Sequence, residues 1–493
     1  MISLITFTPA LGALALIILR GNDQTTRLIA LLTSVVTFML SAIVFFSYDT
    51  GIGGYQFVQR FTWIEAFNIE YLVGIDGLSA PLVLLNGILG LSAVLISWNV
   101  SEKIHTYFMW LLILQSAVMG VFVSLDLILF FIFWELELIP MFFLISTWGT
   151  GRREYSAMKF IIFTFLGSAF MFAAILVLYF SAPELERTFD LTALVHKDLM
   201  NLLVPSSLVF TGFFIAFAVK LPIFPFHTWL PDAHTDAPTA VSVMLAGVLL
   251  KMGGYGLLRI NAGLFPTELI SFAPILATLA VINVLYGAFI VMRQNDLKRL
   301  VAYSSVSHMG FVILGLASVG ASSDTISAAG LNGAALQLFT HGTITGLLFV
   351  IVGLVYERTH TRNISDMSGL ATKIPIIAVG FMIAGLASLG LPLTSGFVAE
   401  VLIFIGVFPA YQVATILTVT GVVLAAGYIL WTAQRVFFGP LGNNWGYLKD
   451  ANLVDISTML ILALPIFIVG IYPAILTNVF EAGIAPIFER FTF

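Results

Sequence analysis

The chain has 493 residues, of which 59% are hydrophobic and only 10% charged, with a formal net charge of −5 at pH 7. Soluble domains are nearer a quarter charged, so this composition excludes a water-soluble fold of the same length. Cysteine is absent, which excludes disulfides, thiolate-bound iron–sulfur clusters and covalent haem attachment in this chain.

Apolar blocks of about 20 residues, the length that spans a bilayer core, recur from the first residues to near the end. The pattern predicts an all-α, polytopic membrane protein with about 14 spans, because open strand edges are not tolerated in lipid. The expected spans are centred in Leu4–Leu19, Ile29–Phe46, Leu78–Trp98, Phe108–Phe122, Leu127–Trp148, Phe160–Phe180, Leu202–Trp229, Ala240–Ile260, Leu269–Val291, Val301–Val319, Ala328–Tyr356, Ile374–Phe408, Val413–Phe438 and Ile456–Phe480.

Basic residues gather in the loops that follow odd-numbered spans, for example Arg152, Arg153, Arg293 and Arg299. The positive-inside rule therefore places both termini on the non-cytoplasmic face. We expect residence in a bacterial inner membrane or a thylakoid membrane.

Spans seven and twelve are interrupted. Span seven carries Pro222 and Pro225 in KLPIFPFHTWLP, and span twelve carries Pro392 between two glycines in SLGLPLTSGF. Proline removes a helical hydrogen bond, and paired broken helices point to a transport site. Proline and glycine kinks are also common in ordinary membrane helices.

The two interrupted spans are five apart and so run in opposite directions, which predicts two inverted five-helix repeats. The expected organisation is N-terminal helices in 1–100, a first repeat in 101–260, a second in 261–440 and a C-terminal helix in 441–493.

An ionisable residue near the bilayer centre of an apolar span costs at least about 2.5–3.5 kcal/mol, so each such residue calls for a structural or functional explanation. Glu135 lies mid-span, and Lys220 directly precedes the interruption at Pro222. A Glu135–Lys220 pair would form a coupled proton switch. The alternative is a structural ion pair. Glu137, two positions on, is expected on another side of the helix, where packing explains it better.

A second mid-span lysine, Lys251, lies among glycines in span eight, and Glu400 follows the interruption of span twelve. Both are candidate proton carriers. The structural alternative for Lys251 is a lysine that only packs. The alternative for Glu400 is a negative charge that the helix dipole stabilises at the N-terminus of a half-helix.

Histidines supply candidate relay stations at His227, His308 and His341, since neutral imidazole accepts a proton at one nitrogen and donates at the other. Each is equally compatible with a hydrogen-bonded core histidine. His234, between Asp232 and Asp236, is expected to be a cap or turn residue in a loop. No metal site is predicted, since HxxxH and HExxH spacings are absent.

Long motifs, WELELIP, KLPIFPFHTWLPDAHTDAPT, LAGVLLKMGGYGLLR, DLKRLVAYSSVSHMG and LPLTSGFVAE, closely resemble the chain 4, or M-type, subunits of bacterial and plastid complex I. The resemblance covers nearly the whole chain. It implies 14 helices with two inverted repeats, and it places the family's functional residues at Glu135, Lys220, Lys251 and Glu400, with relay imidazoles at His227, His308 and His341.

The resemblance further implies a proton-translocating subunit of an NAD(P)H or ferredoxin:quinone oxidoreductase. No cofactor is expected in this chain; quinone, iron–sulfur clusters and FMN are expected in partner subunits. The implied partners are other membrane-arm subunits, including further antiporter-like ones, with the lipid bilayer and protons but no nucleic acid.

Motifs such as GRRE and YERTHT resemble the cyanobacterial and plastid branch, whereas APT at 237–239 resembles the general bacterial form. The electron donor therefore stays open. Two rival functions also stay open: a subunit of a multi-subunit Na⁺/H⁺ antiporter of the Mrp type, and a structural scaffold of a membrane arm.

Overall fold

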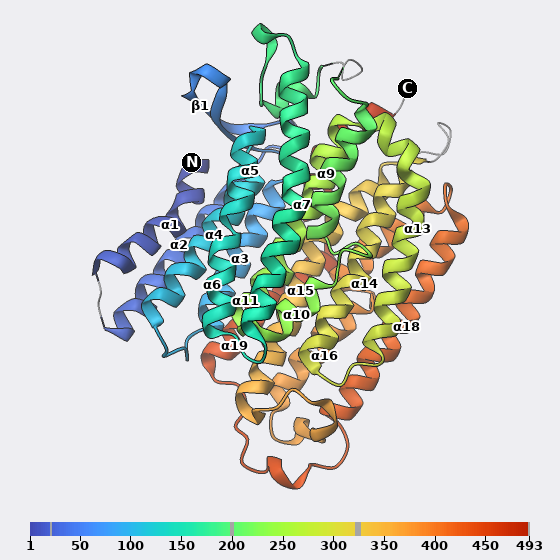
Figure 1. Cartoon of the computed structure of the whole chain (residues 1–493). Helices are drawn as coiled ribbons and strands as arrows, with labels where there is room; N and C mark the ends of the chain where they lie inside the picture. Colours follow the sequence, from blue (N-terminus) through green and yellow to red (C-terminus); the bar gives the residue numbers. More distant parts are fainter. Residues whose placement is uncertain (20–21, 198–201, 321–326, 492–493) are drawn as a thin grey trace.

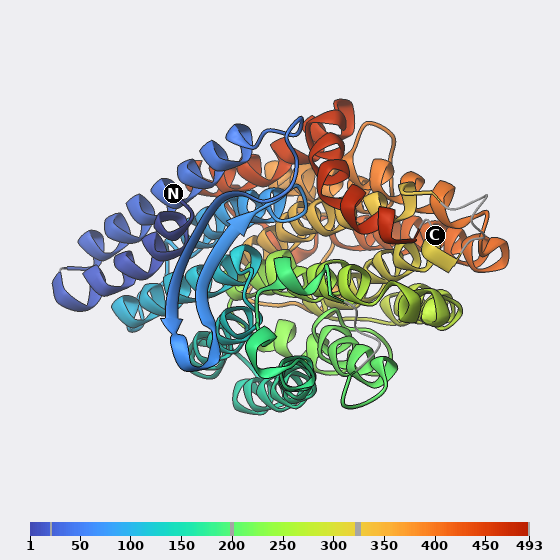
Figure 2. The same cartoon turned by 90° about the horizontal axis from the view of Figure 1, so that it is seen from above.

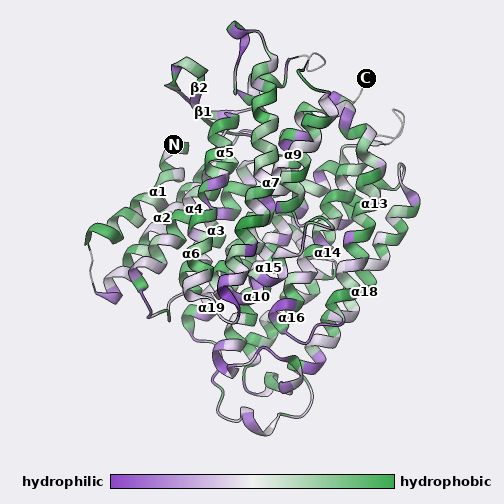
Figure 3. Cartoon of the chain, in the orientation of Figure 1, coloured by the Kyte–Doolittle hydropathy of each residue, from purple (hydrophilic) through white to green (hydrophobic). Residues whose placement is uncertain are grey.

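The structure, a computed structural model, describes residues 1–19, 22–197, 202–320 and 327–491 and confirms the all-helical membrane fold (Figure 1). Within these described ranges, eleven helices are long and apolar enough to cross a membrane. Shorter apolar helices supply the remaining spans: α3, α9 as the first half of span seven, and α16 and α17 as the two halves of span twelve. Coloured by hydropathy, the flanks of the bundle are mostly apolar (Figure 3).

The helices up to span seven are α1 (Ile2–Leu19), α2 (Asp23–Ser47), α3 (Ala80–Ile96), α4 (Ile104–Val123), α5 (Leu127–Leu136), α6 (Leu138–Trp148), α7 (Arg153–Ser181), α8 (Leu191–Leu194), α9 (Ser206–Lys220) and α10 (Trp229–Asp236). Span eight is made of α11 (Thr239–Met244), the π-helical η3 (Leu245–Leu249), α12 (Leu250–Gly256) and the π-helical η4 (Leu257–Ala262).

The later helices are α13 (Pro266–Val291), α14 (Leu297–Ala317), α15 (Ala329–Thr359), α16 (Pro375–Ser388), α17 (Ser395–Val407), α18 (Gln412–Val436), α19 (Leu453–Ile471) and α20 (Ala474–Phe488). Residues 221–228 separate α9 from α10 and are called the first break; residues 389–394 separate α16 from α17 and are called the second break.

The loop between α2 and α3 folds into an antiparallel hairpin of β1 (Gln56–Ile64) and β2 (Ile69–Ile75), which the span pattern did not predict. It curves over the end of the bundle that carries both termini (Figure 2). The Tyr71 hydroxyl donates to Ser3 Oγ at 2.8 Å and ties the hairpin to α1. The two termini share one end of the bundle, as an even number of spans requires.

Two aspartates mark equivalent starts in the two expected repeats. Asp126 caps α5 and Asp296 caps α14; each accepts from the amides two and three residues on, at 2.8 and 3.0 Å and at 2.8 and 2.9 Å. Each aspartate also forms an isolated antiparallel bridge, Asp126 with Asp190 and Asp296 with Asn363. Because α5 opens span five and α14 opens span ten, the two motifs lie on opposite faces, which supports the inverted relation.

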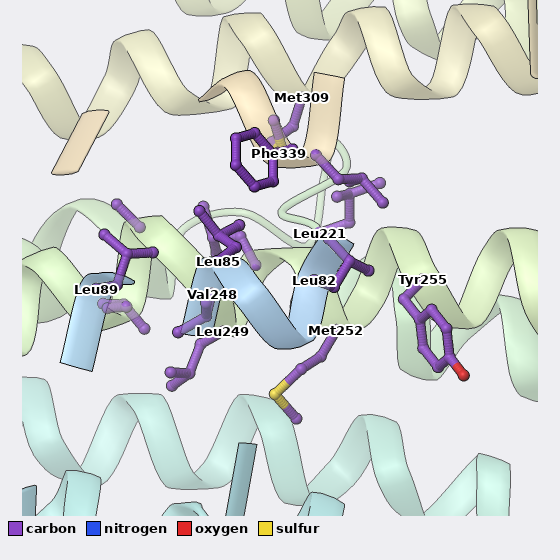
Figure 4. Close-up of a cluster of buried hydrophobic side chains, with 14 of the residues drawn as sticks. Leu82, Leu85, Leu89, Leu221, Val248, Leu249, Met252, Tyr255, Met309 and Phe339 are labelled. Carbon is purple, nitrogen blue, oxygen red and sulfur yellow. The ribbon is translucent and has the colours of Figure 1, made fainter. Parts of the chain in front are cut away.

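The centre of the bundle is formed by span eight and α15, whose apolar windows are entirely buried, while α2 and α18 are mostly exposed to the surroundings. Leucines of α3 meet Val248 and Leu249 of η3, Met309 of α14 and Phe339 of α15 in one cluster (Figure 4). The most polar of the predicted groups therefore sit where no lipid reaches, which is the environment they require.

Candidate proton-conducting site

The first break is held by side chains that replace the missing helical bonds. Pro222 has no amide hydrogen, so the chain turns out of α9 immediately after Lys220. Asn283 of α13 donates to the Pro222 carbonyl at 3.2 Å and accepts from the Phe224 amide at 2.8 Å. Trp229 Nε1 donates to a carbonyl in the last turn of α9 at 2.9 Å. The irregular backbone is thus satisfied by protein, as membrane depth demands.

Lys220 forms a buried ion pair with Glu137, not with the expected Glu135. The Lys220 side chain is 1% exposed and that of Glu137 is fully buried. The rings of Trp134 and Phe160 lie 5.6 and 5.2 Å from the ammonium. Aromatic faces stabilise a cation in such a position without accepting a proton.

The helical geometry around the two acids explains the difference. Helix α5 ends at Leu136 and α6 begins at Leu138, because Pro140 has no amide hydrogen for the Leu136 carbonyl. Glu137 keeps helical dihedral angles (φ −68°, ψ −22°) and so faces another side of the helix from Glu135, but Lys220 lies on that side, and the expectation that Glu137 only packs is wrong. Glu135 is half-buried beside Ser168 of α7, within electrostatic reach of Lys220.

Lys251 lies at the start of α12, directly after the π-helical turn η3. A π-helical turn leaves carbonyls out of the ordinary helical pattern, and the Lys251 ammonium donates to the Ala246 carbonyl within that turn. Its second contact is His341 Nδ1 of α15, at 2.7 Å. Both side chains are almost entirely buried, so this lysine and this histidine can exchange a proton directly.

The series continues from α15 to the second break. The His341 and His308 rings have centroids 5.8 Å apart, and His308 Nδ1 lies 3.7 Å from Glu400 Oε1. His308 Nε2 contacts the Ser388 hydroxyl at 3.0 Å and the Tyr428 hydroxyl at 3.4 Å. Four of the predicted residues, Lys251, His341, His308 and Glu400, therefore form one buried series, which we call the central series.

A glycine makes room for the end of this series. Gly390 has φ +76°, a left-handed conformation that side chains rarely adopt. A Cβ built on Gly390 would also lie 2.7 Å from Glu400 Oε2. The second break thus needs glycine both for its backbone and for the carboxylate beside it.

His227, the remaining predicted relay, lies apart from the central series. Its Nε2 is 3.2 Å from the Tyr286 hydroxyl, and its ring stacks on Phe224 within the first break. Its contacts among the described residues include none of the other predicted carriers.

Sequence reasoning missed His234, which is a buried member of α10 and not a loop residue. It stacks on Phe349 of α15 at 4.5 Å, and neither ring nitrogen has a hydrogen-bond partner in the described part of the chain. Lys251 and Lys298 both lie within its electrostatic reach. Its place between Asp232 and Asp236 suggested a solvated turn, although the apolar span that follows the motif was a signal of burial.

Lys298 lines a cavity at the end of the bundle opposite the termini. Its ammonium donates to the Ala237 carbonyl, and its side chain lines a cavity of about 200 Å³ that also includes Thr239, Glu357 and Arg362. The positive-inside rule predicts that this end faces the cytoplasm. The arrangement offers a polar approach from that face towards Lys251.

These features define a class: a membrane protein with two broken spans, whose interior carries a buried series of acids, bases and imidazoles suited to moving protons. Residues 124–425 match the family model described as NADH:quinone oxidoreductase/Mrp antiporter, transmembrane. The chain belongs to this family, which confirms the resemblance seen in its motifs.

Curated relatives and solved structures agree. The chain is 42% identical over 486 residues to NAD(P)H-quinone oxidoreductase chain 4 of Synechococcus elongatus, covering 97% of this chain and 89% of the relative. It is 37% identical to NADH-quinone oxidoreductase subunit M of Rhodobacter capsulatus, covering 100% and 97%. A chain of respiratory complex I from Thermus thermophilus matches with TM-score 0.89 at 28% identity over the full length of both.

A chain of the Mrp complex from a Dietzia species shares the fold, with TM-score 0.86 at 19% identity, covering 100% of this chain and 98% of that one.

Proposed function

We propose that this chain translocates protons as a membrane subunit of a complex I-type NAD(P)H or ferredoxin:quinone oxidoreductase. The observation that carries the proposal is the central series, which links Lys251 on span eight to Glu400 behind the second break. Buried groups that hold and release protons, placed within short transfer distances, conduct protons but offer no volume for a bulky solute.

Energy for this transport comes from partner subunits. Moving one charge against the membrane potential costs about 2.3 kcal/mol per 100 mV, which exceeds thermal energy several-fold. Quinone, iron–sulfur clusters and FMN belong to those partners, and quinone reduction there would displace charge towards Lys220. Protons would then be taken up from the cytoplasm and pass through Lys251, His341 and His308 to Glu400.

The partners are further membrane-arm subunits, antiporter-like ones among them, in a bacterial inner or thylakoid membrane. The shared fold with an Mrp complex chain favours cation/proton antiport as the second candidate. Purifying the chain with its partners and identifying them by mass spectrometry separates the two, because the Mrp alternative would bring small antiporter subunits in place of quinone-site and iron–sulfur subunits.

The functional test replaces Lys220 with Met in the assembled complex and measures proton pumping beside quinone reduction. We expect pumping to be lost while the complex still assembles, because methionine of similar length fills the space of the lysine but cannot supply the charge that pairs with Glu137. The exposed lysine variant Lys373→Met is the matched control and should pump normally. Normal pumping by Lys220→Met would favour a scaffold role instead.

A further inference from the structure

Next to the first break the Lys220 ammonium pairs with the Glu137 carboxylate and also interacts electrostatically with a second carboxylate, Glu135. Glu137 takes the ion pair, and Glu135 lies within electrostatic reach of both other groups. We call these three residues the two-acid cluster. Lys220 neutralises only one of its two acids.

The charge of the two-acid cluster fixes how many protons it binds. With all three groups ionised, it would carry a net negative charge at a buried position. An uncompensated buried charge costs several kcal/mol, whereas one bound proton makes the cluster neutral. One proton held between the two acids would therefore make the cluster neutral, and the two acids would then titrate as a coupled pair.

The two acids differ in burial and in their free oxygens. Glu135 is half-buried beside Ser168, whereas Glu137 is fully buried between α5 and α6. Glu135 Oε1 and Glu137 Oε2 are both buried without a hydrogen-bond partner among the described residues. Each acid thus has an oxygen ready to hold the shared proton.

We propose that Glu137 is a second proton-carrying carboxylate, which alternates with Glu135 as the partner of Lys220. In the resting state Lys220 pairs with Glu137 and the proton sits on Glu135. In the switched state the O–H bond at Glu135 is broken, one forms at Glu137, and the Lys220 ammonium moves to Glu135. One proton is transferred, no electron moves, and the cluster stays neutral in both states. The inference rests on the proposed function.

The burial difference gives this step a direction. The proton moves from the half-buried acid to the fully buried one, and so towards the interior of the bundle. There the helix of Lys251 packs directly on the first break: a Cβ built on Gly253 would lie 2.7 Å from the Leu221 amide nitrogen and 2.8 Å from the Phe217 carbonyl. The switch thus faces the segment in which the central series begins.

The first test is Glu137→Gln in the assembled complex, with Glu184→Gln, an exposed loop acid, as the matched control. We expect the rate of proton pumping to fall at least about tenfold, because a positioned proton-transfer group supplies about 10²–10⁴-fold in rate. The control should pump normally. Normal pumping by an assembled Glu137→Gln complex would overturn the inference.

A second measurement separates proton carriage from a structural ion pair, and it does not depend on Glu137→Gln assembling. Infrared difference spectra on turnover should show one protonated carboxyl band lost and another gained. Glu137→Asp keeps the acid, and we expect it to shift the gained band and leave the lost band in place. An Asp variant with the wild-type spectrum would exclude Glu137 as a proton carrier.

The two proposals fail differently. If Lys220→Met pumps normally, the proposed function itself is wrong. If Lys220→Met and Glu135→Gln lose pumping while Glu137→Gln retains it, the proposed function stands and only the role of Glu137 is wrong.

Discussion

The two breaks resemble each other in position but not in chemistry. The first break follows an ion pair between Lys220 and Glu137, and its backbone is satisfied by the side chains of Asn283 and Trp229. The second break precedes Glu400, which meets an imidazole. The first break thus lies beside two opposite charges, whereas the second lies beside the carboxylate and imidazole at the end of the central series.

The comparison shows that a broken helix provides a position for ionisable side chains within the membrane span. The residues around the break determine the chemistry of those side chains. Prolines end α9 beside a charge pair, whereas Gly390 makes space for a single carboxylate. We expect the charge pair at the first break to respond to a displacement of charge and the central series, from Lys251 to Glu400, to conduct protons. Four changes would break or sharpen this comparison.

The largest effect is expected at the link between the repeats. His341→Gln keeps a side chain that can hydrogen-bond to Lys251 but cannot pass a proton on. We expect proton pumping to fall by about tenfold or more, since positioned proton-transfer groups supply at least that factor. Pumping assays on reconstituted complexes measure it, with His196→Gln, an exposed loop histidine, as control. Unchanged pumping would remove His341 from the series.

Gly390→Ala tests the second break. A left-handed conformation costs a residue with a Cβ about 1–2 kcal/mol, and the added methyl crowds Glu400. We expect a lower thermal midpoint of the complex and reduced pumping. Gly427→Ala, on α18, is the matched control, since a Cβ there meets no atom within 4 Å. Equal behaviour of the two variants would show that the space beside Glu400 is not needed.

His234→Gln tests uptake from the cytoplasmic end. If protons pass from the cavity at Lys298 through His234 to Lys251, this variant should slow pumping several-fold and leave quinone reduction less affected. The deficit should be largest at high pH, where protons are scarce at the entry. Initial pumping rates measured across a pH series check this. A deficit that does not vary with pH would argue for a packing role against Phe349.

The smallest effect is expected at the caps of the two repeats. Burial raises the pKa of Asp126 from 3.8 to about 6, against the backbone amides that donate to it. Folding therefore favours the protonated form, and stability should rise as the pH falls from about 6 towards 4. Asp126→Asn should remove this gain, while Asp296→Asn, at the equivalent cap, should retain it. Thermal midpoints between pH 4 and pH 7 measure it; identical profiles for the two variants would contradict the burial argument.

Much of this arrangement was predictable from sequence, because ionisable residues stand out in apolar spans. Lys251, His308, His341 and Glu400 were each identified in that way. Their order in space was not, since the contacts join spans eight, ten, eleven and twelve, and spacing along the chain carries no information on such packing.

The errors have local physical causes. Glu137 was assigned to packing because a helix turns it away from Glu135, and spacing along the chain could not show that Lys220 lies on the side that Glu137 faces. His234 was placed in a loop because Asp232 and Asp236 flank it, but Asp232 pairs with Lys159 at 2.7 Å and leaves the histidine facing inward. The domain boundaries at 100, 260 and 440 stay a prediction.

The most direct test of the whole account is the proton pumping of Lys251→Met, Glu400→Gln and the double variant, measured side by side in assembled complexes that still reduce quinone. If Lys251 and Glu400 are the two ends of one series, the pumping rate of the double variant should equal that of the single variant with the lower rate. Losses that multiply, or normal pumping in either single variant, would contradict a single conducting series between the two repeats.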